Sequence, residues 1–154
     1  MDSKISFEES SDLFHSESNQ LQDVINSALK SEKLTISEMV QSYYQVMKVS
    51  SISKILKDNF QSSTDPKHQD LVNKIHHVQK QITEKFDAKL HPLIVSQLTD
   101  SIQKYTGNLQ SLDKNSGQKS KQGIEIEANL YKELRELMST KEFVEQYENG
   151  LKDD

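Results

Sequence analysis

Large apolar residues return every three or four positions along most of the chain, as they do on one face of an α-helix. A first run is Leu21, Val24, Ile25, Ala28 and Leu29. A second is Ile36, Met39, Val40, Tyr43, Met47, Ile52, Ile55 and Leu56. A third is Leu71, Ile75, Val78, Ile82, Phe86 and Leu90. The pattern predicts a helical region over residues 19–112, in which each helix buries one face.

Breaks between these helices are expected near residues 31–35, 61–65 and 91–92. Thr35 and Glu38 have the spacing of a capping box, which starts a helix, and Pro66 after Asp65 suits a helical first turn. Pro92 removes one helical hydrogen bond and clashes with the carbonyl of residue 88. The apolar spacing nevertheless continues beyond it, through Leu98. A kinked helix and a tight break both fit, and the apolar run 93–95 favours the break.

The C-terminal part predicts a flexible loop followed by further helices. Residues 113–123, "DKNSGQKSKQG", contain no large apolar residue and two glycines. In 124–150 the apolar positions are Ile124, Ala128, Tyr131, Leu134 and Met138. Ser139 with Glu142 suggests a new helix start or a bend, and Gly150 suits a left-handed helix end. We expect these C-terminal helices to pack on the same bundle as the helical region.

Residues 1–18 are rich in serine and acidic. They carry five acids and one lysine, and they contain few large apolar residues, among them Phe7, Leu13 and Phe14. Such a composition is typical of disorder, so we expect a disordered acidic N-terminal tail.

The fold class expected from these elements is all-α: a bundle of five or six helices that is coiled-coil-like in part. Only 4 glycines and 2 prolines occur among 154 residues, too few for the many turns of an all-β fold. Apolar residues make up 33% and charged residues 28%. The low apolar share favours helices with wide solvated faces, or a core that a partner completes.

The residues needed for chemistry are scarce. The chain has no cysteine, and its histidines lack the helical spacing of metal ligands. We also see no glycine-rich phosphate loop and no nucleophile motif. We therefore expect no enzyme activity, no cofactor and no metal. Arg135 is the only arginine, which argues against nucleic-acid readout. Neither a signal peptide nor a membrane span is evident, so a soluble cytoplasmic protein is expected.

What remains is surface for binding other proteins. Tyr43, Tyr44 and Met47 lie together on the second predicted helix, Tyr43 and Met47 on its apolar stripe and Tyr44 beside it. Aromatic residues and methionine are enriched at protein interfaces. Phe143 and Tyr147 form a similar group near the end of the chain. Lys74 and Lys80 are candidate charged contacts on the third helix.

One segment resembles a known family. "LQSLDKNSGQ", followed by a helix, is similar to the join between the last two helices of the BAG domain, a three-helix co-chaperone module. The family binds its chaperone through a basic pair and a glutamine on the last helix. Lys121 and Gln122 fall at the basic pair, but no valine and glutamine follow in register. We therefore make no assignment to this family.

Two functions fit the sequence. The first is a non-enzymatic interaction subunit or adaptor of a multiprotein assembly, which acts through amphipathic helix faces and self-associates through Leu71–Leu112 if it stands alone. The alternative is a monomeric regulatory module, like a co-chaperone or a small-GTPase effector, that grips one globular client. In the alternative, charge reversal at Lys74 and Lys80, or Tyr44→Ala, is expected to weaken binding without unfolding the chain.

Overall fold

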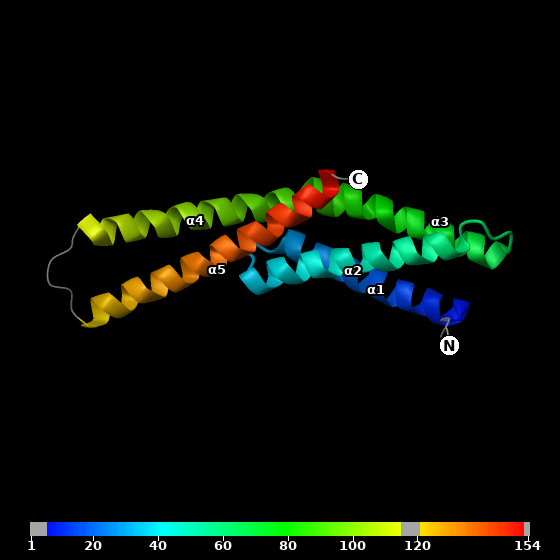
Figure 1. Cartoon of the computed structure of the whole chain (residues 1–154), viewed down its shortest axis with the longest axis horizontal. Helices are drawn as coiled ribbons and strands as arrows, with labels where there is room; N and C mark the ends of the chain where they lie inside the picture. The colour runs from blue at the N-terminus through cyan, green and yellow to red at the C-terminus, as the bar shows by residue number, and fades with distance from the viewer. Residues whose placement is uncertain (1–5, 115–120, 153–154) are drawn as a thin grey trace. The chain divides into compact units, whose positions relative to one another are not determined.

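The computed structural model describes residues 6–114 and 121–152, and throughout these ranges the regular structure is helical. The chain divides into two compact units, Met1–Pro92 and Leu93–Asp154. Figure 1 shows the course of the helices. The all-α class predicted from the sequence is confirmed.

The first unit is built from three helical segments. They are α1 (Phe7–Lys30), α2 (Ile36–Phe60) and α3 (Pro66–Gln81), and α3 runs on into a π-helical segment, η1 (Ile82–Leu90). α2 packs against both α1 and α3, and α1 also contacts η1. The most deeply buried side chains of this unit are Phe14, Met39, Tyr43, Val46, Val49, Leu71, Ile75, Phe86 and Leu90.

Residues 31–35 and 61–65 separate these helices, and the sequence predicts a break at both places. The Thr35 hydroxyl accepts a hydrogen bond from the backbone N–H of Glu38 at 3.1 Å, and the Glu38 carboxylate accepts one from the N–H of Thr35 at 3.0 Å. The Asp65 carboxylate accepts from the N–H of Lys67 at 2.9 Å, with Pro66 in the first turn. These local bonds satisfy donors that a helix start otherwise leaves unpaired.

The prediction of a disordered tail over residues 1–18 was wrong for the part that the structure describes. Ser6 caps α1 by accepting from Glu9 N–H, and Phe14 is only 1% exposed. The Phe7 ring lies 5.5 Å from that of Phe60 and 4.7 Å from that of His68. Phe7, Phe14 and Leu21 are spaced by seven residues and share one face, so the helix gains enough apolar burial to offset its ordering. The first five residues lie outside the described ranges.

The tight break favoured at residues 91–92 was also wrong, because the backbone stays helical through Pro92. α4 (His91–Lys114) follows η1 directly. In η1 the turn is wider than in an α-helix, and the His91 N–H donates to the Phe86 carbonyl five residues back. A wider turn eases the clash between a proline ring and the carbonyl four residues before it, so π-helix is a reasonable way to accommodate Pro92. The boundary between the two units nevertheless falls at this proline.

The second unit contains α4 and α5 (Lys121–Lys152), which run antiparallel as a helical hairpin. Its buried residues include Leu98, Leu109, Leu137 and Val144. Tyr105 on α4 is hydrogen-bonded to the Glu133 carboxylate on α5, and this bond raises the pKa of the tyrosine hydroxyl above its ordinary value. The bond ties the middle of the two helices together.

The C-terminal boundaries differ from those expected. Lys114 ends α4, and α5 already begins at Lys121, so the expected loop over 113–123 is helical at both ends. Its central residues, 115–120, lie outside the described ranges. Ser139, Glu142 and Gly150 all lie inside α5, where helical hydrogen bonding continues, so the expected new start near 140 and the left-handed end at Gly150 are absent. The described residues therefore form four uninterrupted helical segments rather than five or six helices.

Candidate partner-binding surface

α2 carries two apolar faces. One is the core face: Met39, Tyr43, Val46, Val49 and Leu56 are each 6% exposed or less. The other, which we call the outer face, consists of Ile36, Val40, Tyr44, Met47, Ser51 and Ile55. Ile36 and Val40 are half-buried, whereas Tyr44, Met47 and Ile55 are 58%, 46% and 57% exposed.

The two adjacent tyrosines therefore have different roles. Tyr43 is 0% exposed, and its hydroxyl lies 2.6 Å from Nδ1 of the buried His91. Its ring meets Phe86 edge to face, with centroids 5.1 Å apart. Tyr43 belongs to the core of the first unit, whereas Tyr44 and Met47 are exposed.

Sequence reasoning assigned the faces of α2 incompletely. It placed Met47 and Ile55 on the buried stripe, and both are exposed. It also missed Ile55 as a surface residue and missed Val46 and Val49 as core residues. The signal was present in the spacing, because Val46 and Val49 follow Tyr43 at intervals of three and Leu56 follows Val49 at seven. The core stripe and the outer stripe of α2 were therefore taken for a single buried stripe.

Polar contacts hold α1 against α2 beside the outer face. The Gln45 amide donates to the Glu17 carboxylate at 2.8 Å and to the Glu17 backbone carbonyl at 3.0 Å. The Lys48 ammonium lies 3.4 Å from the same carboxylate. The hydrogen bond from Gln45 and then the interaction with Lys48 outweigh partial desolvation and lower the pKa of Glu17. Glu17 therefore stays ionised at neutral pH and partly neutralises Lys48, four residues after Tyr44.

The predicted lysines lie on the outside of α3 and η1. Lys74 pairs with Asp70 at 3.2 Å, and Lys80 approaches Glu84 at 3.9 Å. All four side chains are more than half exposed. Pairs of this kind between helix positions four apart contribute only a few tenths of a kcal/mol, roughly 0.3–0.5. Lys74 and Lys80 lie on α3, whereas Tyr44 and Met47 lie on α2.

The second predicted aromatic group lies near the end of α5. Phe143 and Tyr147 are half-buried, and Val144 between them is buried. A shallow hollow of about 80 Å³ adjoins Val144, between α4 and α5, and is lined by Val95, Leu98, Thr99, Lys141, Glu145 and Glu148. The group therefore contributes more to the hairpin than to open surface.

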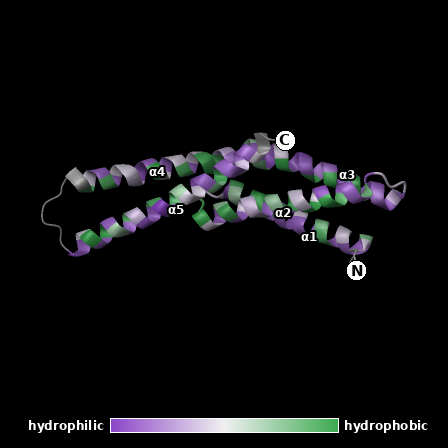
Figure 2. Ribbon diagram, in the orientation of Figure 1, coloured by the Kyte–Doolittle hydropathy of each residue, from purple (hydrophilic) through white to green (hydrophobic). Residues whose placement is uncertain are grey.

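α5 also exposes apolar residues that the sequence places on its buried stripe. Ile124, Tyr131 and Met138, spaced by seven, are exposed, whereas Leu137 is buried. In Figure 2 hydrophobic residues recur along α5 between hydrophilic ones. The expectation that Ile124, Tyr131 and Met138 face the core was wrong. The less exposed positions are Leu134, which was expected on the stripe, together with Leu130 and Leu137.

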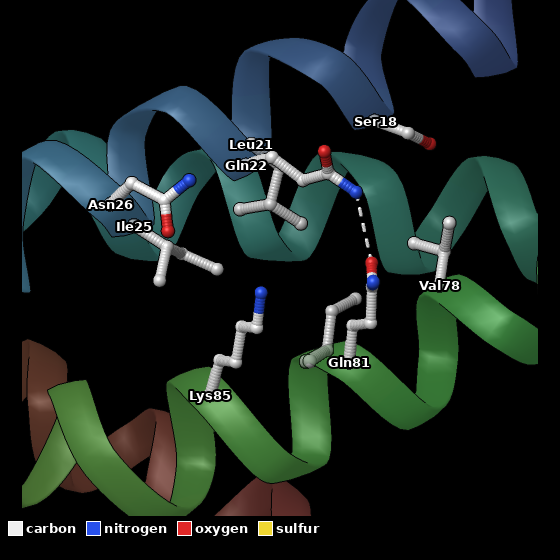
Figure 3. A pocket seen from close by; sticks show the side chains of 9 residues that line it. Ser18, Leu21, Gln22, Ile25, Asn26, Val78, Gln81 and Lys85 are labelled. Atoms are coloured by element: carbon white, nitrogen blue, oxygen red, sulfur yellow. Dashed lines mark hydrogen bonds between the residues drawn. The ribbon is translucent and has the colours of Figure 1, made fainter.

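A groove between α1 and the junction of α3 with η1 is too small for a ligand. Its apolar floor is formed by Leu21, Ile25, Val78 and Ile82, and its rim carries polar side chains. Figure 3 shows Gln22 and Gln81 joined across it by a hydrogen bond of 2.9 Å, while Lys85 extends toward α1. The accessible space is about 10 Å³, which is enough for one water. The groove is part of the packing between α1 and α3.

Within the described ranges, no three histidine or acidic side chains come together as metal ligands. No helix in the same ranges combines the length and apolarity required to cross a bilayer. Comparison with known proteins gave no matching family model, curated protein or solved structure.

Proposed function

We propose that this protein is a non-enzymatic interaction subunit or adaptor, and that it binds other chains through the outer face of α2. The proposal rests on the second apolar stripe of α2, because the residues of its core face are already buried. Tyr44, Met47 and Ile55 stay exposed on it while Tyr43 is buried. Exposed apolar patches of this kind, rimmed by polar residues, mark protein interaction sites.

The composition of the face agrees with binding rather than with solvation. Tyrosine and methionine supply large contact area, and methionine adapts its shape to a partner. Ser51 is the polar position within the face, and the exposed Lys48 and Lys54 are its charged neighbours. A regular stripe at helical spacing fits best the apolar face of another helix, which meets it by knobs-into-holes packing.

The proposal is tested by placing a photo-activatable phenylalanine analogue at position 44 of the full chain and irradiating it in extract of the native cells. We expect covalent adducts with defined proteins, identified by mass spectrometry. The same analogue at Ser50, which is exposed on α2 but is not part of the outer face, is the control. Adding Met47→Glu to the first variant is expected to abolish its adducts. Equal adducts at both positions, or none, would refute binding through this face.

A further inference from the structure

Tyr43 contacts two side chains of the helix formed by α3, η1 and α4 that an α-helix would place on different sides. The Tyr43 ring lies edge to face against Phe86, with centroids 5.1 Å apart. Its hydroxyl lies 2.6 Å from Nδ1 of His91, five residues further along the chain. Five residues turn an α-helix by about 140° beyond a full circle, whereas they turn a π-helix, with about 4.4 residues per turn, by only about 50° beyond it. Tyr43 therefore meets both side chains because η1 is in the π register.

The burial of the residues that follow η1 agrees with the same register. Ile94 is 0% exposed, and its neighbour Leu93 is 54% exposed. With η1 in the π register, Ile94 falls within about 10° of Phe86 around the helix axis, and Leu93 points about 110° away. With an α-helix throughout, Leu93 would fall within about 20° of Phe86, and Ile94 would lie about 80° away. The apolar run 93–95 thus supplies an apolar residue to the buried side in either register.

We infer that η1 is a conformational switch between two helical registers, and that Tyr43 holds it in the π register. In the π form His91 is buried and Leu93 is exposed. In the α form Leu93 takes the buried side and His91 turns outward. Because α4 follows η1 without a break, the rotation of about a quarter turn passes into the helix that begins the second unit. Turns of π-helix inside α-helices frequently mark functional sites.

Pro92 lowers the energetic difference between the two registers. In the α register the amide of residue 92 would donate to the carbonyl of residue 88, but proline has no N–H, and its ring clashes with that carbonyl. In the π register the His91 N–H donates to the Phe86 carbonyl. The hydrogen bond between Tyr43 and His91, both of them buried, stabilises the π register alone. Removing either the proline or the tyrosine hydroxyl is therefore expected to shift η1 toward the α register.

The chain has no native cysteine, so a single introduced thiol reports the register. Leu93→Cys is labelled with a maleimide in the full-length chain, alone and together with Pro92→Ala or with Tyr43→Phe. We expect fast labelling without the second substitution, since Leu93 is 54% exposed, and slower labelling with either one. Equal populations of the two registers lower the rate about twofold, and a larger shift lowers it further. Ser50→Cys, at an exposed position of α2, is the control, and its rate is expected to stay unchanged.

Unfolding cannot imitate the expected result, because a loosened helix speeds labelling at position 93 rather than slowing it. Labelling of the same variants in urea corrects for any effect of the neighbouring residue on the thiol. His91 supplies the opposite readout: its modification by diethyl pyrocarbonate, located by mass spectrometry, is expected to become faster in Pro92→Ala. Circular dichroism verifies that each variant keeps its helices.

Slower labelling at position 93 in both variants, with faster modification of His91, supports the switch. Labelling that is unchanged or faster in both variants overturns it. Slower labelling in only one variant would overturn the part of the mechanism assigned to the residue changed in the other. None of these outcomes bears on binding through the outer face of α2, which the adducts at position 44 test separately.

Discussion

At the scale of single residues, adjacent positions have opposite roles because a helix turns by about 100° per residue. Tyr43 points into the core and meets Phe86 and His91, whereas Tyr44 is 58% exposed on the outer face. The residue types alone do not distinguish the two. Their surroundings decide that one is a stability residue and the other a candidate contact.

Removing the Tyr43 hydroxyl is expected to destabilise the first unit. Tyr43→Phe keeps the ring against Phe86 but deletes the buried bond to His91, which lies at 2.6 Å. Loss of one partner from a buried hydrogen bond costs about 1–3 kcal/mol. Urea unfolding followed by circular dichroism measures the change. Tyr44→Phe, at an exposed position, is expected to stay within about 0.5 kcal/mol, and equal losses in both variants would contradict this account of Tyr43.

Glu17 is expected to make stability depend on pH in the acid range. Its pKa is lowered in the folded state by Gln45 and then Lys48, so the folded protein binds a proton less readily than the unfolded chain does. The resulting stabilisation is fully present at neutral pH and is lost as the pH falls through the lowered pKa.

The test compares wild type with Glu17→Gln by urea unfolding at neutral and at acid pH. At neutral pH the variant is expected to be less stable by about 1 kcal/mol, since its amide oxygen can still accept from Gln45 but no longer carries the negative charge that strengthens the bond. Below the lowered pKa the difference is expected to shrink, because the wild-type carboxyl is then protonated too. A difference that is the same at both pH values would show that ionisation of Glu17 has no part in stability.

At the scale of elements, local signals located helix starts better than helix ends. The bonds of Thr35 with Glu38 and of Asp65 with Lys67 involve residues within one turn, so the sequence contains all that they need. Ser139 with Glu142 has the same spacing, yet α5 continues through it. A capping pattern only permits a start, and a helix that packs along its whole length overrides it.

The N-terminal helix is expected to contribute strongly to stability. Phe14 is 1% exposed, so Phe14→Ala leaves a cavity and is expected to cost about 3–5 kcal/mol. The neighbouring Leu13 is 43% exposed, and Leu13→Ala is expected to cost less than about 1 kcal/mol. Thermal unfolding of both variants tests this. A Phe14→Ala variant as stable as wild type would support the disordered tail that the composition suggests.

At the scale of the whole molecule, the chain forms two units that meet at Pro92, within a continuous run of helix. Most of the deeply buried residues, from Phe14 to Leu90, belong to the first unit. The second unit is a two-helix hairpin in which the bond of Tyr105 to Glu133 is one tie between the helices. A three-helix unit buries more apolar surface per residue than a two-helix hairpin does. The first unit is therefore expected to be more stable than the second.

A fragment containing residues 1–92 is therefore expected to fold without the hairpin. Its helices pack on one another through Tyr43, Ile75 and Phe86, all 0% exposed. We expect helical circular dichroism and a cooperative thermal transition. The fragment with Tyr43→Asp, which places a charge in the core, serves as the unfolded control. A fragment that melts without a cooperative transition would mean that the first unit depends on the second.

The sequence by itself determined the all-α class, the breaks at 31–35 and 61–65, and the caps at Thr35 and Asp65, because each depends on composition or on contacts within one turn. Tertiary structure decided the rest. It ordered residues 7–18 through burial of Phe14, and it kept the helix continuous through Pro92 by way of η1. It also divided the apolar residues of α2 between core and outer face. Periodicity shows that a residue lies on an apolar face, but only the packing of other helices determines which apolar face is covered.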